Sequence, residues 1–345
     1  MYKKLLSLII MLNLALFAIA GNPDRQGEAG AYELLMNPWP RSGALNSLNA
    51  SRVGGIEAMM LNPAGLCRIN NWELGLAQTK WLRPSGIEIS SGAFATKIGK
   101  NGTLGIALMS LSLGDIKVTT TTNPEGTGAT YSPTFSNIAV GYSHLFGNKI
   151  SVGFLLRGIS EGIQDLSAFG MSIDAGVQYV TGDDNNFKFG IALRNIGGPM
   201  SFSGDGLSAQ LKSPENTDLT YNIRLSRFEL PSQLHIGISY DINPSEHISF
   251  TPIVNFTSNS FGRDEIGAGI DTKLTKYLDV RASYKLELGE AIEGDVNTAH
   301  TGLAAGMTVN VPLSKKNDSR LAIDYCYRHS DPFDGTHQIG LRLEF

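Results

Sequence analysis

The sequence predicts an all-β fold: a transmembrane antiparallel β-barrel of about fourteen strands with an N-terminal plug segment in its lumen. Three observations lead there. Apolar and polar residues alternate from residue 72 onward, the connections are alternately short and long, and the N-terminus has the pattern of an export signal. They divide the chain into a signal peptide at residues 1–20, a plug at 21–70 and an outer-membrane barrel at 71–345.

The first twenty residues decide the predicted compartment. Lys3 and Lys4 precede an apolar run, residues 5–19, and the small residues Ala18 and Ala20 form a cleavable site. A retained membrane anchor is the alternative, but the run is short for a spanning helix. We therefore expect a cleaved leader and a chain in the bacterial outer membrane, surrounded by lipid.

Composition agrees with a sheet whose two faces meet different surroundings. Charged residues make up 17% of the chain, against roughly 25% in ordinary soluble domains, yet the mature chain contains no apolar run long enough for a spanning helix. The net charge is -4, with no cluster of Lys and Arg that could bind phosphates. A nucleic-acid partner is not expected.

The strands are recognised by apolar residues at every second position. Each candidate is close to the nine to eleven residues that a tilted spanning strand needs. The apolar faces begin and end at residues 72–76, 87–89, 104–108, 138–142, 150–156, 169–179, 187–193, 234–240, 248–256, 266–270, 278–286, 303–311, 321–327 and 339–345.

The connections alternate in length, as they do in outer-membrane barrels. A soluble β-sandwich, the alternative fold, has no reason to sort its loops in this way. Short turns are expected at 99–102, 147–149, 182–186, 243–246, 275–276 and 314–318, and long connections at 115–132, 159–168, 197–231, 257–264, 289–299 and 328–336.

The last strand is the clearest single signal in the barrel. Ile339, Leu341, Leu343 and Phe345 are apolar at strict period two, and the chain stops on that aromatic residue. A final strand of this kind predicts the closing strand of an outer-membrane barrel, which must pair with the first strand because lipid does not tolerate an open sheet edge.

Many polar side chains alternate with the apolar ones. A charge near the bilayer midplane costs roughly 2 to 4 kcal/mol, so these side chains are expected to face the lumen. They are Arg157, Asp174, Gln178, Arg194, Asp271, Arg281, Lys285, Asp324, Arg328 and Arg342.

No residue pattern points to catalysis, a metal or a cofactor. His329, Ser330 and Asp331 are adjacent in one connection, where three side chains rarely converge into a triad. The acidic turn 183–186 is too short for a calcium loop, and no glycine-rich phosphate loop opens a helix. We expect a non-enzymatic protein.

The two cysteines leave an alternative open. Export permits a disulfide, and Cys326 is on the lumen face of its strand, while Cys67 ends the plug. They could pair with each other or remain two free buried thiols.

The plug is expected at residues 21–70, where alternation breaks down. A barrel of about fourteen strands has a lumen too wide for wall side chains alone to fill. Asn62, Pro63, Ala64 and Gly65 are expected to turn the chain from plug to wall, because Pro63 fixes its own backbone angle and Gly65 tolerates a left-handed one.

Residues 29–66 resemble a known family. The segment 54–66, ending in Asn62-Pro63-Ala64-Gly65-Leu66, is similar to the N-terminal signature of FadL-like barrels, and residues 29–35 with the small residues that follow resemble the PorV/PorQ family of Bacteroidetes. The resemblance implies a fourteen-stranded outer-membrane barrel of type IX secretion. Its implied partners are the secretion translocon, secreted cargo or a surface attachment complex.

Two functions follow. The first is a component of type IX secretion that binds proteins through long extracellular loops, above all residues 197–231, with both termini in the periplasm. The alternative is a FadL-like passive transporter of hydrophobic small molecules. The charged residues assigned to the lumen favour the first.

Overall fold

The structure is a computed structural model, which describes residues 23–182, 184–214, 216–245, 248–289, 299–313 and 319–345. The predicted signal peptide, residues 1–20, lies outside the described residues. None of the helices in these ranges is long and apolar enough to cross a membrane.

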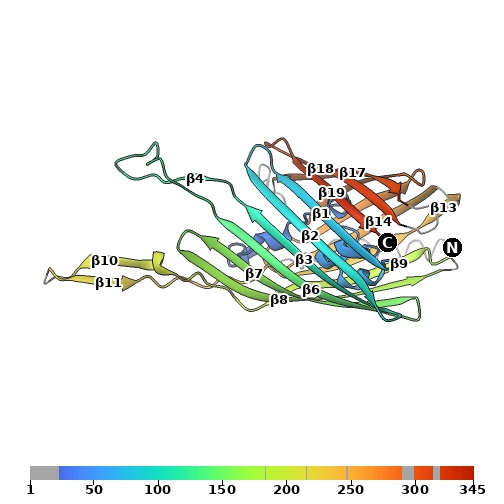
Figure 1. Ribbon diagram of the computed structural model, residues 1–345, viewed down its shortest axis with the longest axis horizontal. Coiled ribbons are helices and arrows are strands. Elements are labelled where there is room, and N and C mark those ends of the chain that lie inside the picture. The colour runs from blue at the N-terminus through green and yellow to red at the C-terminus, as the bar shows by residue number, and fades with distance from the viewer. Residues whose placement is uncertain (1–22, 183, 215, 246–247, 290–298, 314–318) are drawn as a thin grey trace.

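The wall is a closed antiparallel barrel, as predicted (Figure 1). One 15-stranded sheet closes on itself where β12 pairs with β14, and without the short β13 (Ile242–Ser245) it has fourteen wall strands. These are β1 (Trp72–Trp81), β2 (Ile87–Ile98), β3 (Gly102–Ser112), β6 (Thr134–Phe146), β7 (Ile150–Ile163), β8 (Leu166–Thr181), β9 (Phe187–Gly197), β12 (Gln233–Tyr240), β14 (Ile248–Asn259), β15 (Glu265–Lys273), β16 (Leu278–Glu287), β17 (His300–Pro312), β18 (Arg320–Ser330) and β19 (Thr336–Glu344).

The closing strand pairs with the first strand. β19 runs antiparallel to β1 with Leu341 opposite Leu76, and the Phe345 backbone N–H donates to the Trp72 carbonyl oxygen at 3.0 Å. The rings of Phe345 and Trp72 stack with their centroids 4.2 Å apart. Ile339 and Leu341 point outward and are exposed, so the alternation of this strand was interpreted correctly.

The two faces of the wall are separated largely as the sequence predicts, and outward positions carry exposed aliphatic side chains on every wall strand. The predicted apolar face at residues 87–89 is wrong at Ile89, which points inward and is buried, while Ser90 faces outward. The polar side chains assigned to the lumen point inward. Of these, Arg157, Asp174, Gln178, Arg194, Arg281, Asp324 and Arg342 are buried, and Asp271, Lys285 and Arg328 are half-buried.

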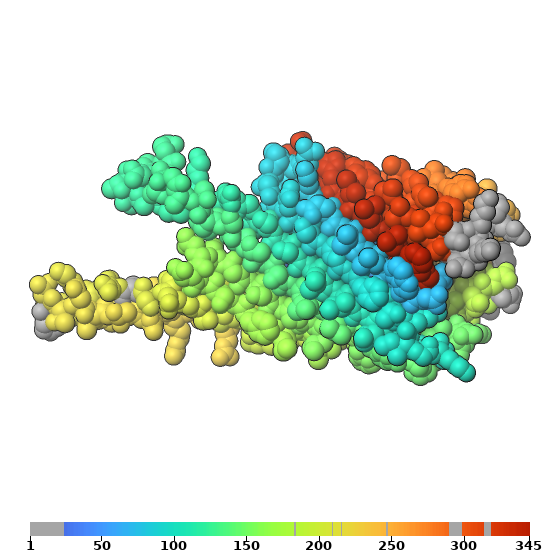
Figure 2. Space-filling view, in the orientation of Figure 1, coloured from blue at the N-terminus to red at the C-terminus, as the bar shows by residue number. Residues whose placement is uncertain are grey.

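Short turns gather at the end of the barrel where Phe345 lies, which we call the turn end. The opposite, loop end carries two long arms (Figures 1 and 2). One is residues 113–133 with β4 (Ile116–Lys117) and β5 (Thr130–Tyr131). The other is residues 198–232 with η5 (Asp205–Leu207) and a hairpin of β10 (Ser208–Lys212) and β11 (Asp218–Asn222).

The prediction of a long connection at residues 159–168 is wrong. These residues are largely strand, because β7 continues to Ile163 and β8 starts at Leu166. Only a tight turn remains, in which Gln164 has a positive φ of 49°. The outward residues there are small or polar, including Ser160 and Ser167. The apolar alternation therefore fades before the hairpin ends, although the strands keep their pairing.

The N-terminal segment, which we define as residues 29–67, is made of short helices that lie inside the ring of strands in Figure 1. Nearly all of its residues are buried. After η1 (Pro23–Arg25) come η2 (Tyr32–Leu35), α2 (Pro40–Gly43), η3 (Gly55–Glu57), α3 (Ala58–Leu61) and η4 (Pro63–Cys67).

Candidate functional site

The predicted turn Asn62–Gly65 contacts the inner face of β7, β8 and β9, which we call the clamped sector. The Asn62 side chain caps η4 by accepting from the Ala64 backbone N–H at 3.2 Å, and its Nδ2 donates to the Ala50 carbonyl oxygen at 2.8 Å. The same amide lies 3.3 Å from the Val177 carbonyl oxygen of β8. Asn62 therefore joins two parts of the N-terminal segment to the wall.

Wall glycines allow this approach. A methyl group on Gly153 would overlap the Pro63 backbone, and one on Gly190 would overlap the backbone of Ala50. At Gly65 the obstacle lies inside the N-terminal segment itself, because a methyl group there would overlap the Val53 carbonyl group. The turn thus depends on glycine on both sides of the contact.

A second attachment joins residues 37–46, on either side of α2, to β16, β17 and β19. Gln338 Nε2 of β19 donates to the Asn37 carbonyl oxygen at 2.6 Å, and Ser283 Oγ of β16 donates to the Ala44 carbonyl oxygen at 3.0 Å. Asn46 Nδ2 donates to the Gly302 carbonyl oxygen at 2.7 Å. The segment is held at two places on the wall.

The charged lumen residues pair with each other and with the segment. Arg157 bonds Asp174 at 2.8 Å and Arg342 bonds Asp324 at 3.4 Å. Asp271 accepts both Arg281 at 3.0 Å and Arg52 of the segment at 2.6 Å. These charges fasten the wall and segment together, so they do not make an open polar channel.

The inner face of β2, β3 and β6 is different, and we call it the apolar sector. Its inward residues include Ala93, Ala107, Met109 and Ala139, which face Trp39, Met59 and Met60 of the N-terminal segment. Within the described ranges, no hydrogen bond joins the segment to β2 or β3, whereas on β6 the Ser143 hydroxyl donates to the Ala64 carbonyl oxygen at 2.9 Å. An inner cavity of about 20 Å³ remains between wall and segment.

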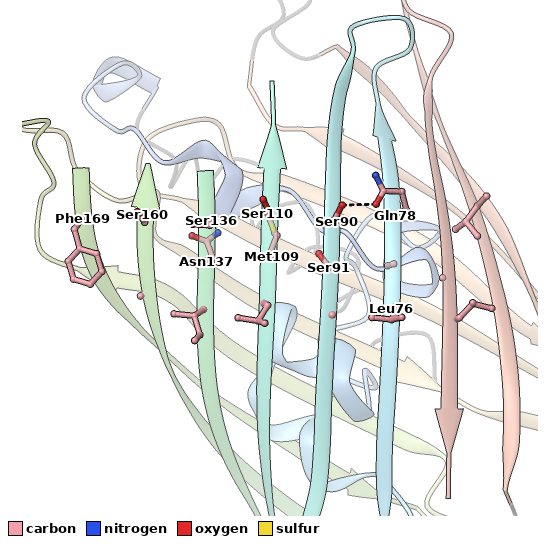
Figure 3. Close-up of a pocket in the computed structure, with 18 residues that line it drawn as sticks. Leu76, Gln78, Ser90, Ser91, Met109, Ser110, Ser136, Asn137, Ser160 and Phe169 are labelled. Atoms are coloured by element: carbon pink, nitrogen blue, oxygen red, sulfur yellow. Dashed lines mark hydrogen bonds between the residues drawn. The ribbon is translucent and has the colours of Figure 1, made fainter. Parts of the chain in front are cut away.

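On the other side of this wall lies an outer groove of about 720 Å³ (Figure 3). Cross-strand pairing makes its polar edge a continuous outward row, Gln78–Ser90–Ser110–Ser136–Ser160, flanked by Ile339 and Phe169. The next row is apolar and is hollowed by two glycines: Leu76, Gly92, Leu108, Ile138 and Gly158.

The outer groove and the inner cavity share four residues, which we call the wall patch: Ser91, Leu108, Met109 and Asn137. They come from three neighbouring strands, β2, β3 and β6. A single layer of sheet therefore separates an apolar space outside the barrel from an apolar space inside it.

Of the two alternatives left open for the cysteines, the structure has the free thiols. Cys67 and Cys326 are both free and buried. Cys67 Sγ lies 3.3 Å from the Ala64 carbonyl oxygen in η4, which packs on β6, β7 and β8, whereas Cys326 is on β18, against α2. The two thiols are thus on different sides of the lumen.

The candidate triad does not converge. His329 Nδ1 is 2.8 Å from Thr301 Oγ1, and Ser330 Oγ donates to the Phe333 carbonyl oxygen at 3.4 Å. In the part of the chain that the structure describes, no group of three or more His, Cys, Asp or Glu side chains could hold a metal ion.

No family model and no curated protein matches the chain. Solved structures do. The chain is similar to the Pseudomonas putida toluene transporter TodX, with 15% identity over 87% of this chain and 96% of that one, and a TM-score of 0.55. The CymD monoaromatic hydrocarbon channel gives 14% identity over 90% and 98%, with a TM-score of 0.56. The chain has the fold of these channels.

The Ralstonia pickettii toluene transporter TbuX agrees, with 13% identity over 86% and 99% of the two chains and a TM-score of 0.51. At such identities the likeness concerns the fold. The protein therefore has the fold of these transmembrane barrels, a closed antiparallel barrel of fourteen strands, as the sequence predicted.

The wall patch was not predicted from the sequence. None of the ten polar residues assigned to the lumen comes from β1, β2, β3 or β6. That gap in the pattern was the available signal. It distinguishes an apolar sector of the inner wall from the charged remainder.

Proposed function

We propose that this outer-membrane barrel is a passive transporter of hydrophobic small molecules. The observation that carries the proposal is the wall patch, where the apolar inner cavity and the outer groove lie on opposite sides of one sheet layer. The structural relatives TodX and CymD, described as a toluene transporter and a monoaromatic hydrocarbon channel, support it.

In this proposal a hydrophobic molecule enters from the loop end and leaves through the wall patch into the membrane. In this proposal the turn end, where Phe345 lies, faces the periplasm, since short turns are periplasmic in bacterial barrels. The first described residues do not support a periplasmic N-terminus: they lie at the loop end, where Ala29 bridges Glu229 of the arm at residues 198–232 and the Arg25 guanidinium lies over the Phe261 ring.

The N-terminal segment acts as a plug that blocks direct passage along the lumen. The ion pairs Arg281–Asp271 and Arg342–Asp324 do not line the inner cavity, and the one charged side chain in its lining, Arg157, is paired with Asp174.

The test is uptake of radiolabelled toluene, at low concentration, by cells with and without the chain. We expect faster uptake in cells that carry it, and no change for a small sugar of similar size. Equal toluene uptake in both strains, with folded barrel present in the outer membrane, would refute the proposal.

Type IX secretion remains the second candidate because one observation favours a protein partner. The β10–β11 hairpin exposes Leu211, Leu219 and Tyr221 on one face, with Leu211 and Leu219 paired across the strands. An isolated hairpin is only marginally stable in water. Co-purification of a translocon subunit or secreted protein from native membranes, lost when residues 208–222 are removed, would support this candidate.

A further inference from the structure

An inward row of side chains crosses the wall patch at one level. Strand pairing places Ala77, Ser91, Met109, Asn137 and Ile159 directly opposite one another on β1, β2, β3, β6 and β7. Figure 3 shows Ser91, Met109 and Asn137 on adjacent strands. Ser91 and Asn137 therefore flank Met109 in this row.

Both polar side chains lack partners. Ser91 is 7% exposed and Asn137 is 4% exposed, and neither the Ser91 hydroxyl nor either atom of the Asn137 amide has a hydrogen-bond partner among the described residues. Arg157, which also lines the inner cavity, has an unpaired Nε. Leaving such groups unpaired costs roughly 1 to 3 kcal/mol each, so the arrangement calls for an explanation.

Poor hydrogen bonding of every buried amide in the lumen does not explain the unpaired groups of Ser91 and Asn137. Asn62 and Gln178 are equally buried amides on the inner side, and each makes at least two hydrogen bonds. In the described ranges, Asn137 is the one buried amide side chain whose oxygen and nitrogen both lack a partner. Buried atoms without a partner also occur elsewhere in the lumen, such as Asn49 Oδ1 and Ser172 Oγ, but Ser91 and Asn137 are the unpaired residues that line both the inner cavity and the outer groove.

We propose that Ser91 and Asn137 form a polar subsite for the hydroxyl group of a hydrophobic alcohol or phenol. This inference rests on the proposed function and narrows its substrate class. An amide offers one acceptor and two donors, which matches a hydroxyl group that both donates and accepts. Apart from Arg157, the rest of the lining is apolar and includes Trp39, Met59, Met60 and Ala107.

An anionic ligand fits less well. The nearest cation, Arg157, already bonds Asp174 at 2.8 Å, and both side chains are buried. A carboxylate would be left without a compensating charge in an apolar space, which is costly. An uncharged hydroxyl avoids that penalty.

Met109 lies between the two polar residues, and all three line the inner cavity. That cavity, of about 20 Å³, has room for about one water molecule, so it must widen to admit a ligand. Methionine has three rotatable bonds and adapts to irregular spaces. In this proposal a rotation of the Met109 side chain contributes to the widening.

The test compares two ligands of one shape, naphthalene and 2-naphthol, the latter uncharged at pH 7. Binding of each to the full chain in detergent micelles is measured by equilibrium dialysis against micelles without protein. We expect 2-naphthol to bind about tenfold more tightly than naphthalene, as two modest hydrogen bonds would give. Asn137→Leu should reduce this ratio to near one without weakening naphthalene binding, and Ser91→Ala should reduce it in part.

The matched controls are Ser90→Ala and Ser136→Ala, which remove a hydroxyl from the adjacent position of the same strands but on the outward face. They should keep the tenfold ratio. Equal binding of the two ligands by the unaltered chain, or a preference that survives in Asn137→Leu, overturns the subsite and leaves it a site for water alone, while the proposed function stands. If neither ligand binds, the proposed function fails together with the subsite.

Discussion

The N-terminal segment meets two sectors of the inner wall in different ways. In the clamped sector, wall glycines such as Gly153 and Gly190 lie against backbone of the segment, and Asn62 and Gln178 cross the contact with hydrogen bonds. In the apolar sector, Gly105 faces the Met59 sulfur, at 2.8 Å from where a Cβ would stand, and hydrogen bonds from β2 and β3 are absent in the described residues.

The two sectors differ in how easily the contact with the N-terminal segment can change. Backbone cannot yield without moving a whole turn, whereas the end of a methionine can change rotamer at little cost. A substitution in the clamped sector should therefore disturb the position of the N-terminal segment, and one in the apolar sector should change passage.

Gly153→Ala should break the clamp. Its methyl group would overlap the Pro63 backbone, and overpacking of this kind costs about 3 kcal/mol at the upper end. We expect a lower unfolding midpoint in heat-modifiability gels and a higher single-channel conductance. Gly162→Ala, on the same strand and in ordinary contact distance of Thr134, is the control. If the two variants behave alike, the clamp is not at Pro63.

The two buried asparagines should respond oppositely. Asn62→Ala removes its donation to the Ala50 carbonyl oxygen and should destabilise the barrel by about 2 kcal/mol. Asn137→Leu replaces an amide without partners by an apolar side chain and should be neutral or stabilising. Urea unfolding in micelles measures both. A large loss in Asn137→Leu would show that this amide has a structural partner.

Glu33 gives the loop end of the N-terminal segment a pH dependence. This carboxyl is 3% exposed and has no hydrogen-bond partner among the described residues; burial, and then the Glu161 carboxylate, raise its pKa to about 7. The packed state thus favours the protonated form. Its contribution to stability is complete below the ordinary value of 4.5 and is lost as pH rises through about 7.

Heat-modifiability midpoints at pH 5 and pH 8 test this sign. The unaltered chain should be less stable at pH 8, and Glu33→Gln, which stays uncharged, should show a smaller difference. An unchanged difference in Glu33→Gln would assign the pH dependence to other groups.

Met109→Leu should act on passage and hardly on stability. The two side chains have similar volumes, and such exchanges usually cost less than about 1.5 kcal/mol. Leucine has fewer rotatable bonds, so opening of the wall patch should slow. We expect slower toluene uptake with an unchanged unfolding midpoint. Uptake equal to that of the unaltered chain would show that Met109 does not limit passage.

Removing residues 208–222 should have the smallest effect on transport. The hairpin projects from the loop end and pairs only with itself in the described residues (Figure 1). We expect a folded barrel with normal toluene uptake. Loss of uptake would place the hairpin in the entry path.

Much of the wall could be predicted from the sequence, because lipid outside and polar groups inside impose strict alternation, as in Ile339, Leu341 and Leu343. The role of the charged residues could not. Their inward direction is visible in the alternation, but the pairing of Arg157 with Asp174, or of Arg52 with Asp271, depends on which strands meet across the lumen. The charged residues alone therefore do not decide between the two predicted functions.

The candidate site was harder still. Ser91 and Asn137 lie far apart in sequence, and each is unremarkable in an inward position; their significance comes from the missing partners. The cysteines illustrate the same limit, since the sequence allowed a disulfide that the placement of η4 and β18 does not form. Contacts between the segment and individual strands are set by packing that periodicity does not encode.

Filling the inner cavity is the most direct test of passage through the wall patch. Ala107 of β3 lines that cavity, whereas Ala175 of β8 points outward. Uptake of radiolabelled toluene should be measured in cells carrying Ala107→Leu or Ala175→Leu, with folded barrel quantified in both. We expect Ala107→Leu to lower toluene uptake to the level of cells without the chain, and Ala175→Leu to leave uptake unchanged. Full uptake with the cavity filled would contradict passage through the wall patch.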